Sequence, residues 1–177
     1  MSTEMKDQSA NNELIITRTF NAPLELVFKA FTEAEHLAQW WGPKGFSITI
    51  HKLDLRPGGT FHYNMKSSDS SEMWGIFHFK EIAYPNRIVF INSFSDPDGN
   101  ITRPPFSDDW PLEIVNEFTF HEQDNNTIMN LRSYPVNANP DQQRTFTAGH
   151  SSMQEGYGGT FDQLEEHLFK MIGDLTP

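Results

Sequence analysis

The chain has 177 residues, enough for one domain with a sizeable core, and its 15 phenylalanines predict an interior lined by aromatic rings. Its formal net charge of −11 disfavours binding to nucleic acid or to an anionic membrane surface, because like charges repel. The absence of cysteine excludes disulfides, thiolate metal sites and a cysteine nucleophile.

The polar residues 1–12 predict a disordered tail, followed by a single domain over residues 13–177. The tail lacks the apolar centre of a signal peptide, and no apolar run in the chain approaches transmembrane length. We therefore expect a cytoplasmic protein that does not enter a membrane.

One strand and two short helices are predicted after the tail. Leu14–Phe20 is rich in β-branched residues and predicts the strand. Pro23 is expected at the first position of the first helix, since its backbone is preset for that place. Thr32 and Glu35 have the spacing of a capping box for the second helix, which the Gly-Pro pair at 42–43 ends. We expect the tryptophans at 40 and 41 to act as a packing clamp.

A series of strands follows. In the predicted hairpin Thr60–Met65 and Met73–Ile82, apolar residues at odd positions share one face and most polar residues share the other. This alternation predicts an antiparallel sheet with one buried side and one wet side. In the turn before the hairpin, Asp54 and Arg56 are expected to form an ion pair. Further strands are predicted from Phe46 to His51, at Arg87–Phe94, at Leu112–Glu122 and at Thr127–Tyr134.

Two isolated polar residues are expected on the buried face of the last two strands. Pairing Phe118 with Leu131 places Asn116 and Ser133 on that same inward side. Buried polar groups need partners, and pockets carry a few polar groups on an apolar lining. Asn116 and Ser133 therefore either bond to each other or to buried water, or they orient a bound ligand.

A long helix is predicted at the end of the chain. It begins at Asn139-Pro140 and either runs to Ile172 or breaks near Gly149. Three glycines, at 156, 158 and 159, each cost about 1 kcal/mol relative to alanine inside a helix. Either the sheet approaches the helix backbone closely there, or the missing side chains leave room for a ligand.

Residues 95–111 hold four prolines without clear periodicity, and we expect the part around Phe106 and Trp110 to act as a lid. No metal-binding spacing, phosphate loop or nucleophile motif is found; the segment from Gly149 to Met153 lacks the second glycine of a nucleophile elbow. We therefore predict no metal, no cofactor and no catalytic residue.

The order of elements, one strand, two helices, five or six strands and a long helix, predicts an α+β fold. Three segments, ITRTFNAPLELVFKAFTEAEHLAQWWGP, DLRPGG and GHSSMQEGYGGTFDQLEEHL, resemble the activator of heat-shock-protein-90 ATPase homologue family of the START-like (SRPBCC) superfamily. The resemblance spans roughly residues 13 to 173. It implies a helix-grip fold, in which a curved antiparallel sheet wraps around a long C-terminal helix and encloses a cavity.

Three functional hypotheses follow. The first is binding of a small hydrophobic or amphipathic molecule between sheet and helix. The second is a cavity enzyme of the polyketide cyclase or aromatase type, and the third is a co-chaperone-like module with a chaperone partner; a homodimer is also left open. The predicted ligand-binding residues are Phe61, Tyr63, Met65, Phe77, Phe79, Trp110, Asn116, Phe118, Met129, Leu131, Ser133, Met153, Tyr157 and Phe161.

Overall fold

The structure is a computed structural model that describes residues 13–175, so the tail predicted at 1–12 lies outside the described residues. The strands are β1 (Leu14–Phe20), β2 (Phe46–Leu53), β3 (Thr60–Ser67), β4 (Glu72–Ala83), β5 (Arg87–Ser95), β6 (Ile114–Gln123) and β7 (Asn126–Pro135). The helices are α2 (Leu24–Thr32), α3 (Ala34–Trp40), α4 (Pro140–Ala148) and α5 (His150–Leu175).

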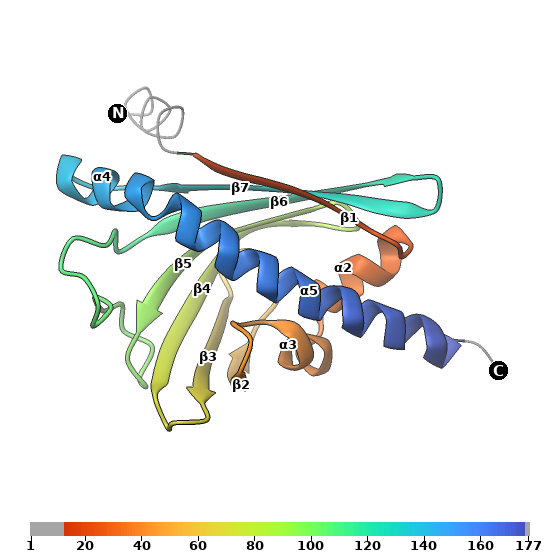
Figure 1. Cartoon of the computed structure of the whole chain (residues 1–177), viewed down its shortest axis with the longest axis horizontal. Helices are drawn as coiled ribbons and strands as arrows, with labels where there is room; N and C mark the ends of the chain where they lie inside the picture. Colours follow the sequence, from red (N-terminus) through yellow and green to blue (C-terminus); the bar gives the residue numbers. More distant parts are fainter. Residues whose placement is uncertain (1–12, 176–177) are drawn as a thin grey trace.

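The seven strands form one antiparallel sheet in the order β1-β7-β6-β5-β4-β3-β2. The sheet curves around α5, which crosses its inner face, while α2 and α3 cover one end of the same face (Figure 1). This confirms the predicted α+β fold, with two short helices after the first strand and a long C-terminal helix. Within residues 13–175, no helix combines the length and apolar character needed to cross a membrane.

The sheet register agrees with the predicted inward face. Phe118 pairs with Leu131, and Asn116 pairs with Ser133, as the alternation of apolar residues required. The predicted strand Leu14–Phe20 has its correct ends, and the ends of the other strands differ by at most two residues. β6, for example, begins at Ile114 and not at Leu112, because its ladder with β7 starts at the pair Ile114–Pro135.

Both predicted helix starts near the N-terminus are wrong in detail. Pro23 has an extended backbone (ψ 152°) and lies just before α2, so it is the capping residue and not the first helical one. The Thr32 hydroxyl donates to the carbonyl of Phe28 at 2.8 Å, inside α2, and is therefore not available to cap α3. Glu33 takes the position before α3 and makes no side-chain capping bond.

The C-terminal helix breaks at Gly149, which settles the alternative left open by the sequence. Asn139 and Gln142 form a capping box at the start of α4, with Pro140 at the first helical position. A side chain at Gly149 would meet the Trp110 ring at 3.3 Å, so this junction fits only a small residue. α5 then runs on for 26 residues and buries Phe161 among the residues of its inner face.

Arg18 links the N-terminal strand β1 to the C-terminal helix α5. Its guanidinium donates to Asp162 of α5 at 2.7 Å and to the Gly158 carbonyl at 3.3 Å. At the opposite edge of the sheet, Arg56 donates to both carboxylate oxygens of Asp54 at 2.9 and 3.0 Å. This confirms the predicted ion pair in the turn between β2 and β3.

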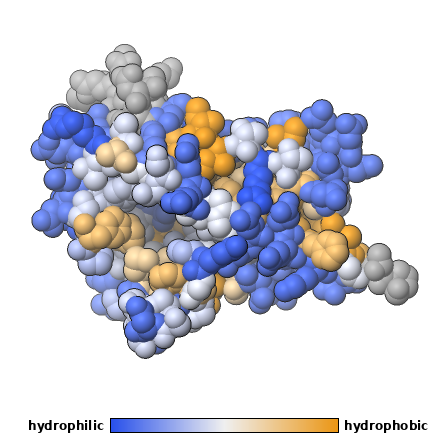
Figure 2. Space-filling view, in the orientation of Figure 1, coloured by the Kyte–Doolittle hydropathy of each residue, from blue (hydrophilic) through white to orange (hydrophobic). Residues whose placement is uncertain are grey.

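Part of the outer face of the sheet is covered and not wet. Residues 96–100 fold back over it, where His62 lies 3.1 Å from the Asp96 carbonyl and is only 8 % exposed. Ser93 and Ser95 lie on the same outer side of β5, and within the described residues their buried hydroxyls have no hydrogen-bond partner. The predicted wet face is therefore limited to the part of the sheet that residues 96–100 leave uncovered. Most of the molecular surface seen in Figure 2 is polar, with smaller apolar patches.

Candidate functional site

A cavity of about 280 Å³ opens between the first half of α5 and the sheet. Its floor comes from β3, β4 and β5, and its rim from the segment after α3 and from Trp110 and Pro111. The lining residues are Trp41, Gly42, Pro43, Tyr63, Met65, Met73, Trp74, Gly75, Asn92, Ser93, Phe94, Trp110, Pro111, Ile114, Met153, Gly156, Tyr157 and Thr160.

Two glycines help to keep this space open. Gly75 pairs with Tyr63 across β3 and β4, and a side chain on Gly75 would come within 2.5 Å of the Tyr63 hydroxyl. The phenol ring therefore lies across Gly75. On the helix, a Cβ built on Gly156 would meet nothing within 4 Å, and the same holds for Gly158. Close approach of the sheet thus does not explain these helical glycines, and Gly156 contributes open space to the cavity.

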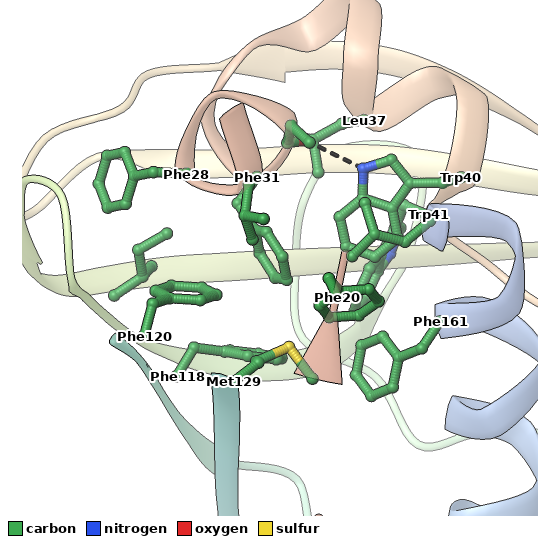
Figure 3. Packing of buried hydrophobic residues seen from close by; sticks show 14 of the residues in the cluster. Phe20, Phe28, Phe31, Leu37, Trp40, Trp41, Phe118, Phe120, Met129 and Phe161 are labelled. Atoms are coloured by element: carbon green, nitrogen blue, oxygen red, sulfur yellow. Dashed lines mark hydrogen bonds between the residues drawn. The ribbon is translucent and has the colours of Figure 1, made fainter. Parts of the chain in front are cut away.

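Further along the sheet, the space between sheet and helices is filled. A second void there has a volume of about 10 Å³, room for about one water molecule at most. Phe77 stacks on Phe90 with ring centroids 3.8 Å apart, and Phe118 packs against Phe31 and Phe161. Figure 3 shows how rings from α2, α3, α5 and the sheet converge in this part of the core.

The predicted ligand-binding residues divide between these two regions. The structure brings five of them together around the cavity: Tyr63, Met65, Trp110, Met153 and Tyr157. Seven others are packed in the core: Phe61, Phe77, Phe79, Phe118, Met129, Leu131 and Phe161. Contact with a ligand remains a prediction for the first five, which are the ones that face open space.

Asn116 and Ser133 are buried beside the cavity but do not line it. The Ser133 hydroxyl donates to Asn116 Oδ1 at 2.9 Å, and the Tyr157 hydroxyl donates to the same oxygen at 3.3 Å. The Asn116 amide donates to the Ile114 carbonyl at 3.3 Å. Their polar groups therefore satisfy one another, and their effect on the cavity is to hold the Tyr157 ring in place.

Several polar residues of the cavity lining escaped the sequence analysis, including Ser93 and Thr160, and Asn92 and Trp41 are the most informative of them. Asn92 lies opposite Phe77, so it continues the inward face of β5 that Phe90 begins. Simple alternation along β5 would have found it. Trp41 was assigned to packing, yet it lines the cavity, and its indole N–H has no hydrogen-bond partner within the described residues although the side chain is only 9 % exposed.

The tyrosines of the cavity stay protonated far above neutral pH. Burial raises the pKa of Tyr63 to about 12, and the nearby Trp41 indole lowers this pKa in part, although the two groups do not meet hydrogen-bond geometry. Burial also raises the pKa of Tyr157, and the neighbouring Tyr63 adds to the shift. Both phenols are therefore hydrogen-bond donors and not bases.

None of the described residues that line the cavity has a charged or imidazole side chain. General acid–base catalysis uses a positioned histidine, carboxylate, amine, thiol or tyrosine hydroxyl, and of these groups the described lining holds only the hydroxyls of Tyr63 and Tyr157. What the lining offers is an apolar and aromatic surface with a small number of uncharged polar groups. The arrangement can bind and orient a molecule, and the protonated hydroxyls of Tyr63 and Tyr157 are the groups in it that could donate a proton.

The expected lid segment lies partly at the cavity. Trp110 and Pro111 form part of the rim, whereas Phe106 is 63 % exposed and does not line the cavity. Phe106 contacts Phe94 and Trp110 edge-on, at centroid distances of 5.6 and 5.9 Å. Phe106 therefore connects the rim residue Trp110 to Phe94 of the sheet through aromatic contacts, outside the cavity itself.

Folding brings Glu33, Glu35 and His36 together at the start of α3, with potential metal-ligating atoms within 4.8 Å of one another. Glutamates near a helix start are favourable without any ion, because they face the positive end of the helix dipole. His36 Nδ1 also lies 2.8 Å from His167 Nε2 of α5. This imidazole pair links the two helices far from the cavity lining.

A curved antiparallel sheet that grips a long C-terminal helix and leaves a cavity at one end defines a START-like helix-grip domain. The match to the family model of Activator of Hsp90 ATPase homolog 1-like protein extends over residues 21–168, and the chain belongs to that family. This confirms the resemblance drawn from the three sequence segments.

Solved structures from several bacteria share the fold. A protein of Arthrobacter aurescens has a TM-score of 0.77 at 22% identity, with 92% of this chain and 88% of that one covered. One from Mycobacterium smegmatis has a TM-score of 0.73 at 24% identity, covering 89% and 90%. One from Nitrosomonas europaea has a TM-score of 0.72 at 24% identity, covering 92% and 97%. No curated protein matches the chain.

Proposed function

We propose that this domain binds a small, largely apolar molecule in the cavity between α5 and the sheet. The observation that carries the proposal is the open space of about 280 Å³ beside a core that is otherwise filled. Large apolar pockets with a few convergent polar groups are the usual form of small-molecule sites. Membership of the family and the fold agree with such a role.

The lining suggests how strong this binding is. Burying about 250 Å² of apolar ligand surface stabilises the complex by about 6 kcal/mol, less the entropy lost on association. Three methionines, Met65, Met73 and Met153, make part of the wall adaptable, because their side chains have several rotatable bonds. We therefore expect dissociation constants of about 40 μM or weaker.

Native mass spectrometry of protein freshly purified from its own cells tests the proposal. We expect an additional mass that is lost on denaturation and recovered in an organic extract. The same spectra read the oligomeric state and so test the homodimer left open by the sequence. A protein that is always free of ligand, and that takes up no compound from a library of small apolar molecules, would contradict the proposal.

A variant that fills the cavity gives a matched control. Gly156→Phe places a ring where a Cβ meets nothing within 4 Å, whereas Gly158→Phe alters the same helix at a position outside the lining. Loss of the bound mass is expected in the first variant and not in the second.

A further inference from the structure

The chemistry of the lining narrows the class of ligand, if the proposed function holds. Three features of the cavity bear on this: the charge of its lining, the aromatic character of its walls, and the hydrogen-bond donors that the protein leaves unused.

The lining disfavours a charged ligand. Since no cavity residue among those described carries a charge, a buried carboxylate or phosphate would lose its hydration without gaining an ion pair. The formal net charge of −11 adds a long-range repulsion for anions. Lys44, which follows the lining residue Pro43, is exposed and does not belong to the lining.

The walls favour an aromatic ligand. The rings of Trp41, Tyr63, Phe94, Trp110 and Tyr157 all border the cavity. Aromatic rings pack on one another in edge-on or offset-stacked arrangements, which add to the gain from simple burial. A cavity of about 150 Å³ holds benzene, so 280 Å³ accommodates about two fused rings with a small substituent.

Some hydrogen-bond donors of the cavity residues are used within the protein and others are not. On the helix side, the Tyr157 hydroxyl donates to Asn116, and the Thr160 hydroxyl donates to the Gly42 carbonyl at 3.0 Å. The Trp41 indole N–H, in contrast, is buried and has no hydrogen-bond partner among residues 13–175. Its ring centroid is 6.4 Å from that of Tyr63, whose hydroxyl lies over Gly75 in the cavity floor.

A buried donor that is left unpaired is destabilising, and an acceptor on a bound ligand removes that penalty. We infer that the cavity takes an uncharged aromatic molecule with a hydrogen-bond acceptor such as a carbonyl oxygen, which the donors of Trp41 and Tyr63 bind. The Asn92 amide, on β5 in the cavity lining, adds a further neutral polar group.

Three ligands of matched shape test the inference by equilibrium dialysis at pH 7.5: 2-naphthamide, 2-naphthoate and 2-ethylnaphthalene. We expect the neutral amide to bind at least tenfold more tightly than the anionic carboxylate, because only the carboxylate must lose its charge hydration. The hydrocarbon reports binding to the apolar cavity alone.

Two variants test the donors. Tyr63→Phe and Trp41→Phe each remove one donor and keep an aromatic ring, and each is expected to weaken amide binding about three- to tenfold while leaving hydrocarbon binding unchanged. Tyr134→Phe is the control, because the Tyr134 hydroxyl bonds to Glu117 away from the cavity. If Trp41→Phe fails to fold, Tyr63→Phe alone decides.

The outcomes separate the inference from the proposed function. If 2-ethylnaphthalene binds but the carboxylate binds as tightly as the amide, or the variants leave amide affinity unchanged, the ligand class is wrong and cavity binding stands. If none of the three compounds binds the wild-type protein, both are contradicted.

Discussion

The two ends of the space between the sheet and α5 are built from the same sheet and the same helix, but one end is filled by side chains and the other is open. At one end, Phe118 meets Phe161 of α5 and Phe77 stacks on Phe90, which leaves a void of about 10 Å³. At the other end, the same strands meet the part of α5 that contains Gly156, and about 280 Å³ remains open. Two features differ between the ends. Glycines face the open end, and β5 pairs with β6 only as far as Asn92–Ile114, whereas its pairing with β4 continues to Ser95. Side-chain volume and the end of the β5–β6 ladder together determine where a ligand has room.

The largest expected effect comes from removing a ring at the filled end. Phe118→Ala should lower the free energy of unfolding by about 3–5 kcal/mol, because Phe118 is fully buried and its neighbours cannot collapse into the space. Met153→Ala, at the open end, should cost less than about 1 kcal/mol. Guanidinium unfolding of both variants measures the difference. Equal losses would show that the two regions are packed alike.

A second test fills the cavity from the sheet side, by adding a side chain at Gly75. Gly75→Ala should destabilise the protein by about 1–3 kcal/mol and abolish ligand uptake, because the new methyl group displaces the Tyr63 ring. In a Tyr63→Leu background the cost should fall, and a double-mutant cycle measures the coupling. If the two changes in the free energy of unfolding are additive, the contact with Tyr63 is not the reason that position 75 requires glycine.

A third test concerns the helix. Gly156→Ala and Gly158→Ala should each raise the free energy of unfolding by up to about 1 kcal/mol, since both positions are free of obstruction. Only Gly156→Phe should also lower ligand affinity, by tenfold or more, because Gly158 does not line the cavity. Thermal unfolding and equilibrium dialysis on the same samples read the two effects separately.

The smallest effect is a pH dependence away from the cavity. Burial, with the nearby His36 and Lys170, lowers the pKa of His167 below 6.5 in the folded state, although Asp174 opposes this. The unfolded chain then binds more protons than the folded one, so stability should fall as pH decreases from about 7.5 to 5.5. His78, whose pKa burial also lowers, adds to this slope. His167→Gln should reduce the slope by a fraction of one proton, measured by denaturant unfolding at each pH; an unchanged slope would contradict the assignment.

Much of the fold could be predicted because it depends on local pattern. The strand Leu14–Phe20 was predicted with its correct ends, and the inward pairing of Phe118 with Leu131 followed from period-two alternation. The helix capped by Asn139 followed from a cap signature that acts over three residues. Pro23 was misplaced by one position, because its fixed φ suits both the cap and the first helical residue.

The site was harder to predict, because alternation indicates which face a residue is on and not whether the space before it is filled. Tyr63 and Phe61 are on the same face of β3, yet only Tyr63 reaches the cavity. Trp41 was missed because its role depends on where α3 ends relative to β3, a long-range relation. Asn92, by contrast, was within reach of the sequence, since it follows Phe90 at the inward spacing.

The pairing of β1 with β7 has a consequence for synthesis on the ribosome. Leu14 pairs with Ser133, so β1 meets β7, its one neighbouring strand within residues 13–175, after more than a hundred further residues have been made. At about 10 residues per second this interval is roughly 12 s, during which β2 to β6 can already pair in succession. Contacts between such distant parts of a chain raise the contact order and slow folding. We therefore expect the addition of β1 to the edge of the sheet, and the ion pair between Arg18 and α5, to be late steps in the folding of the nascent protein.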